Sequence, residues 1–147
     1  MRMALEWLKD LMRPIRRVDA QLGAIRYHRE ARFWEGASDF APTGRQVELL
    51  IDASYRGPTE DQRSFFSELE RRYAALLPRI ASLLRAGARH ATGSDSYDFI
   101  LVAIEIPPPD ALRSSAEWSL SYETMPPKLH LTVQLTGWTP QRVIPEE

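Results

Sequence analysis

The chain has 147 residues, a length typical of a single domain, with the hydrophobic share (44%) and charged share (27%) of an ordinary globular protein. It contains no cysteine, which excludes disulfides, thiolate metal sites and cysteine nucleophiles and fits a cytoplasmic protein. The net charge is −1 and no apolar run approaches the roughly 20 residues of a membrane span, so we expect no nucleic-acid partner and no membrane partner.

The N-terminal part of the chain has helical spacing. Residues 3–12 repeat apolar side chains on one stripe, which predicts a short helix that Pro14 ends. A basic connector follows. We therefore divide the single domain into a helix and connector (1–17), a sheet-and-helix core (18–144) and a charged tail (145–147).

Three strands are expected before the central helix and three after it. Each is a run of alternating or continuous apolar residues bounded by Gly, Pro or polar turns. The expected strands are 22–28, 32–36, 46–53, 98–106, 117–123 and 129–136. Residues 98–106 are apolar on both faces, which predicts a strand covered on both sides, by the long helix and by either the N-terminal helix or another subunit.

The firmest local pattern is the start of the long helix. Thr59 and Gln62 have the spacing of a capping box, and Gly87 follows the apolar stripe as the expected end. Pro78 lies inside the stripe, where it predicts either a kink or a break. The apolar stripe consists of Phe66, Leu69, Tyr73, Leu76, Ile80 and Leu83.

These elements predict an α+β fold. We expect an antiparallel sheet of about six strands in the order β-β-β-α-β-β-β, packed on one long central helix and accompanied by a short N-terminal helix.

Catalytic and metal signatures are not found in the sequence. His90 and Asp95 share a loop with serines, but proximity in a loop does not supply the fixed hydrogen bond that a nucleophilic triad needs. His28 and His130 lie on expected strands without a third ligand at metal-site spacing. We therefore predict no catalytic residue, no metal ligand and no cofactor. The alternative is a small-ligand binder or hydrolase-type enzyme that uses the 87–98 loop.

Binding residues are expected at two places besides that loop. Trp138 follows a glycine at a turn, where an exposed Trp would be a binding hot spot. The last expected hairpin has one polar face, which offers hydrogen-bonding side chains to a partner. The candidate binding residues are Trp138, His130, Gln134, Thr132, His90 and Asp95.

One resemblance covers most of residues 19–144. It is carried by Leu22-Gly-x-Ile25, Trp34-Glu-Gly36, the alternating Val47–Ala53, Pro58-x-x-x-Gln62, Trp118-x-Leu-x-Tyr122 and Leu131-x-Val-x-Leu135-x-Gly-Trp138. This pattern resembles a broad group of small bacterial domains of unknown function, some of them similar to immunity or accessory proteins of polymorphic toxin systems. The resemblance implies a binding role. Together with the missing catalytic signatures and the polar hairpin face, it predicts a non-catalytic protein–protein interaction module, immunity-like or accessory, with a protein partner. A homo-oligomeric structural protein, such as a homodimer, is a further alternative.

Overall fold

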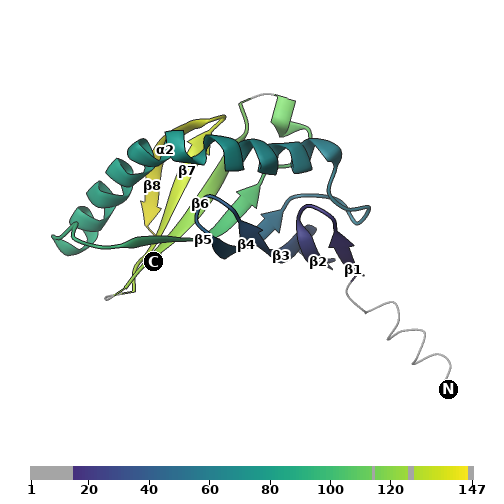
Figure 1. Ribbon diagram of the computed structural model, residues 1–147, viewed down its shortest axis with the longest axis horizontal. Helices are drawn as coiled ribbons and strands as arrows, with labels where there is room; N and C mark the ends of the chain where they lie inside the picture. The colour runs from purple at the N-terminus through teal and green to yellow at the C-terminus, as the bar shows by residue number, and fades with distance from the viewer. Residues whose placement is uncertain (1–14, 114, 126–127, 146–147) are drawn as a thin grey trace, which may run out of the picture.

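The computed structural model describes residues 15–113, 115–125 and 128–145, so the helix expected at 3–12 lies outside the described residues. The described chain forms one eight-stranded sheet with a long helix, α2, on one face (Figure 1). The strands are β1 (Ile15–Asp19), β2 (Gly23–His28), β3 (Phe33–Phe40), β4 (Arg45–Ile51), β5 (Phe99–Ile106), β6 (Glu117–Thr124), β7 (His130–Thr136) and β8 (Thr139–Pro145). The helices are α2 (Glu60–Thr92) and the short 3-10 helix η1 (Ala111–Arg113).

The expected fold class is wrong in strand number and in strand direction. The sheet has eight strands in sequential order, and its central pair, β4 and β5, is parallel. Strands β1 to β4 form one antiparallel meander and β5 to β8 form another. α2 connects the two meanders as a crossover, which returns the chain to the same end of the sheet and makes the neighbouring strands parallel. A mixed eight-stranded sheet with one long helix therefore replaces the expected six-stranded antiparallel sheet.

The two strands that the sequence pattern missed are the edges of the sheet. The sequence pattern assigns residues 15–17 to the basic connector and predicts no strand over 139–145. Each pairs with a neighbour on one side only, and Val18 of β1 is 86% exposed. An edge strand buries few apolar side chains and tolerates proline, as at Pro140. Neither strand therefore carries a strong apolar alternation in the sequence.

α2 begins as expected and ends later than expected. The capping box is confirmed, since the Thr59 Oγ1 accepts from the Gln62 amide at 3.3 Å and the Gln62 Oε1 accepts from the Thr59 amide at 3.0 Å. The helix continues through Pro78 to Thr92, so no break occurs there, and it ends at Gly93 with φ 80°. Gly87 serves packing instead, because a Cβ added there would lie 3.0 Å from a Val143 methyl group of β8.

The core lies between α2 and the sheet. It is formed by alternate residues of β2 to β7, such as Trp34, Leu49 and Trp118, and by one face of the helix. No described element covers the opposite sheet face, which we call the open face (Figure 1). Its members on strands β3 to β7 include Glu35, Glu48, Leu50, Ala103, Glu105, Ser119, Ser121, Thr132 and Gln134. A second cover over β5 is thus not present among the described residues.

Candidate functional site

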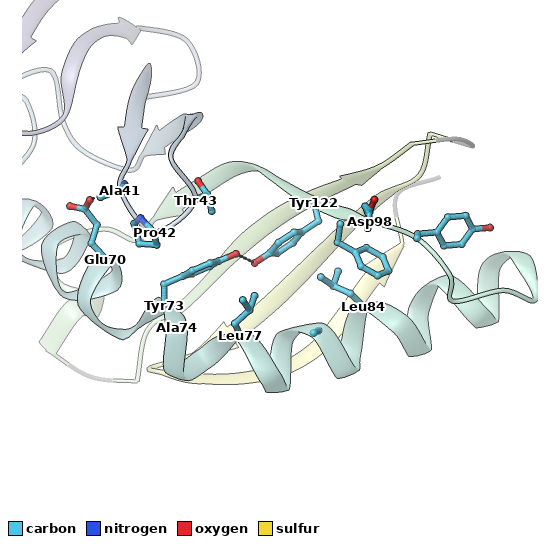
Figure 2. A pocket seen from close by; sticks show the side chains of 13 residues that line it. Ala41, Pro42, Thr43, Glu70, Tyr73, Ala74, Leu77, Leu84, Asp98 and Tyr122 are labelled. Atoms are coloured by element: carbon cyan, nitrogen blue, oxygen red, sulfur yellow. Dashed lines mark hydrogen bonds between the residues drawn. The ribbon is translucent and has the colours of Figure 1, made fainter.

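A groove of about 710 Å³ runs between α2 and the sheet, beside the turn that joins β3 to β4 (Figure 2). We call it the α2 groove. Its lining residues are Ala41, Pro42, Thr43, Glu70, Tyr73, Ala74, Leu77, Ala81, Leu84, Tyr97, Asp98, Phe99 and Tyr122.

One face of α2 forms the long wall of the groove. The lining positions from Glu70 to Leu84 follow the three- and four-residue spacing that places side chains on a single helix face. At 1.5 Å per residue this wall is about 21 Å long. The groove is therefore elongated along the helix axis, and Leu77, which is 40% exposed, lies within it.

Two tyrosine hydroxyl groups meet inside the groove. The hydroxyl oxygens of Tyr73 and Tyr122 lie 2.7 Å apart, and Figure 2 shows the bond between the helix and the sheet. Burial raises the pKa of both phenols, so both are neutral at physiological pH. A single bond between two hydroxyl groups uses one O–H donor, so the pair retains a second O–H group and further lone pairs for a ligand.

The charged groups of the groove are both acidic. Glu70 comes from α2, and its Oε2 accepts from the Ala41 amide at 3.3 Å. Asp98 comes from the segment that leads into β5. No lysine, arginine or histidine is among the lining residues, so the groove is an apolar and aromatic site with a negative electrostatic character.

The 87–98 loop contributes to this groove, though with other residues than expected. Gly87 to Thr92 belong to α2, where the His90 side chain is exposed and forms no hydrogen bond among the described residues. Asp95 forms an ion pair with Arg89, and this hydrogen-bonded guanidinium lowers the pKa of Asp95. The structure thus does not join His90 to Asp95. Tyr97 and Asp98, at the end of this loop, line the groove.

Trp138 is packed against α2. Its ring stacks on Phe65 at 5.0 Å, meets Trp118 edge-on at 5.6 Å and lies 5.0 Å from the Arg72 guanidinium carbon. These contacts make Trp138 part of an aromatic cluster at the edge of the core.

The remaining candidates lie on the open face, away from Trp138. The Oε1 of Gln134 accepts from Arg142 at 2.6 Å, and His130 lies 3.4 Å from a Glu123 oxygen. Thr132 lies opposite Ser121, with 3.3 Å between the two hydroxyl oxygens. The structure brings these three residues together and separates them from Trp138, His90 and Asp95.

The two strand histidines do not meet. His28 lies on β2 and contacts Glu35 at 2.5 Å, whereas His130 lies on β7, with four strands between them. Across residues 15–113, 115–125 and 128–145, no group of three or more His, Asp or Glu side chains is arranged to hold a metal ion. In that same part of the chain, no helix combines the length and the apolar character that a membrane crossing requires.

The sequence pattern placed Tyr73 and Tyr122 in apolar stripes without assigning them a role. The available signal was chemical, because a buried tyrosine hydroxyl requires a hydrogen-bond partner. Comparisons of the chain with protein families, with curated proteins and with solved structures found no match.

Proposed function

We propose that this protein is a non-catalytic binding protein that holds an elongated, mainly apolar ligand in the α2 groove. The observation that carries this proposal is the groove itself, an apolar and aromatic channel with a hydroxyl pair inside it. Ligand sites are typically concave and apolar with a few convergent polar groups. The exposed Leu77 side chain supports the same interpretation, since a ligand would remove it from water.

The polar groups of the groove favour binding over catalysis. Tyr73 and Tyr122 are held neutral by burial, and they bond to each other rather than to a base. A nucleophilic site would require a hydroxyl or amine within hydrogen-bond reach of a general base. The hydroxyl pair is suited instead to orienting a ligand by one hydrogen bond.

A matched pair of helix variants tests the proposal. Ala74 lines the groove, whereas the neighbouring Ala75 is exposed outside it. We expect 1,8-octanediol and 4-phenyl-1-butanol to shift the amide NMR signals of Tyr73, Leu77 and Tyr122 in the wild type. Ala74→Trp should remove these shifts by filling the groove, and Ala75→Trp should retain them. Equal responses of the two variants, or no shifts in the wild type, would contradict the proposal.

A protein partner on the open face is a second candidate function, in keeping with the immunity-like or accessory role that the resemblance implies for a cytoplasmic protein. It is supported by the shared placement of Ser119, Ser121, Thr132 and Gln134 on one sheet face that no described element covers. We expect a partner captured from native lysate to be lost with Ser121→Arg and retained with Ala75→Arg. Capture that is the same for both variants would count against this surface.

A further inference from the structure

We infer that the ligand of the α2 groove is an elongated organic cation with an apolar chain and an amine at each end, such as an alkyl diamine. This inference rests on the proposed binding function and adds the charge of the ligand. It is carried by two carboxylates, Glu70 and Asp98, which Figure 2 shows on opposite sides of the Tyr73–Tyr122 pair.

Both carboxylates lack a counter-charge within the described residues. Glu70 accepts the long hydrogen bond from the Ala41 amide, and among the residues that the structure describes neither Glu70 nor Asp98 forms an ion pair. The acidic residues close to them in the sequence do have a counter-charge, since Glu68 pairs with two arginines and Asp95 pairs with Arg89. The groove therefore retains two negative charges that a cationic ligand would neutralise.

The walls of the groove favour the same ligand. Four aromatic rings line it, from Tyr73, Tyr97, Phe99 and Tyr122. Aromatic faces attract ammonium groups, and the absence of any basic lining residue leaves nothing to pair with a carboxylate or phosphate ligand. An anionic amphiphile such as a fatty acid would meet like charge along the groove. The other residues of the helix wall are apolar or aromatic, which suits the alkyl chain between two amines.

Three probes that share the same chain length but differ in the charge of their ends test the charge preference by titration calorimetry. They are 1,8-diaminooctane, 1,8-octanediol and octanedioate, whose ends are cationic, neutral and anionic. We expect the diamine to bind about tenfold more tightly than the diol and the dianion to bind more weakly than the diol. Added salt should weaken the binding of the diamine and leave the binding of the diol unchanged.

Charge-neutral variants assign the preference to the two carboxylates. Glu70→Gln and Asp98→Asn should each weaken diamine binding about threefold to fivefold and weaken diol binding much less. Retained diol binding also shows that each variant is folded. The matched control is Asp39→Asn, an exposed carboxylate on the other side of the sheet, which should affect neither probe.

The outcomes separate this inference from the function on which it rests. Diol binding without tighter diamine binding, or variants that weaken both probes equally, would overturn the cationic ligand and leave the groove as an apolar binding site. A wild-type protein that binds none of the three probes would overturn both. A diamine preference that Glu70→Gln and Asp98→Asn do not reduce would also overturn the inference.

Discussion

Gln62 joins the start of α2 to the two parallel strands at the centre of the sheet. Its side chain is fully buried. The Nε2 donates to the carbonyl oxygen of Asp52, just past β4, at 2.8 Å, and to that of Pro107, just past β5, at 3.0 Å. The Oε1 accepts from the Thr59 amide. One side chain therefore connects both meanders and the helix.

Gln62→Met should destabilise the protein by about 3 kcal/mol. Methionine has a similar length but makes none of the three side-chain hydrogen bonds, each of which contributes about 1 kcal/mol net. Thr59→Ala is the control for the loss of one capping bond, because it removes only the bond from the Gln62 amide to the Thr59 hydroxyl and should cost about 1 kcal/mol. Gln62→Met keeps that bond and loses the other three, so it should cost clearly more than Thr59→Ala.

Gln62→Glu adds a pH dependence to the same site. The introduced carboxylate would face the two carbonyl oxygens, and burial and repulsion should raise its pKa in the folded state above the unfolded value of about 4.3. The variant should therefore be most stable below about pH 4.3 and lose stability relative to wild type as the pH rises toward the folded pKa. The measurement is the free energy of unfolding in urea at several pH values.

Two results would refute this account of Gln62. One is a Gln62→Met protein within about 1 kcal/mol of wild type, which would mean that the three bonds contribute little net stability. The other is a constant difference between Gln62→Glu and wild type from pH 4 to pH 7. Tryptophan fluorescence suits the urea titrations, because Trp34 and Trp118 are buried in the core.

Three further predictions concern packing and ionisation. Gly36→Ala should destabilise the protein by about 2 kcal/mol or more, because the added Cβ would lie 2.5 Å from a carbonyl oxygen of β2. Gly44→Asn should be nearly neutral, because Gly44 has φ +64° and open space around it. Equal free energies of unfolding for the two variants would contradict this prediction. Burial raises the pKa of Tyr73 and Tyr122, so the free energy of unfolding should be constant below the unfolded-state tyrosine pKa of about 10 and should fall above it. The measurement is tyrosine ionisation followed by ultraviolet absorbance. Reversible ionisation of all five tyrosines near pH 10 in the folded protein would refute this prediction. Trp138→Ala should lower the free energy of unfolding by about 2 kcal/mol, and Trp138→Phe should lower it by much less. A Trp138→Ala protein as stable as wild type would show that the ring does not contribute to the core.

The parts of the fold that sequence reasoning predicted are those with strong local signals. The capping box at Thr59 and Gln62 is confirmed because its two hydrogen bonds depend on residues three apart. Strands β2 to β7 were recognised from their alternation, with ends that differ by a few residues. β1 and β8 were not, because edge strands bury little and Val18 and Pro140 give no strand pattern.

The candidate site depends on contacts that no local pattern contains. Tyr73 and Tyr122 are 49 positions apart, and their hydroxyl pair exists because α2 crosses β6 at that point. Glu70 and Asp98 are likewise far apart in the sequence, and they line one groove only because α2 packs against the sheet. The polar hairpin face was predicted correctly as a face, since Ser121 and Thr132 are cross-strand neighbours in one local hairpin.

The α2 groove follows from the way the helix crosses between the meanders. At its start, α2 is held to β4 and β5 by Gln62, and its later turns pack mainly on β7 and β8. The first meander reaches the early turns of the helix: Asp19 pairs with Arg63, Phe40 contacts Phe66 and Tyr73, and the Ala41 amide donates to Glu70. Within the described residues its polar and aromatic contacts with α2 end at Tyr73, and the face that bears Leu77 is left open beside the β3–β4 turn. The crossover that makes the central strands parallel therefore also creates the groove.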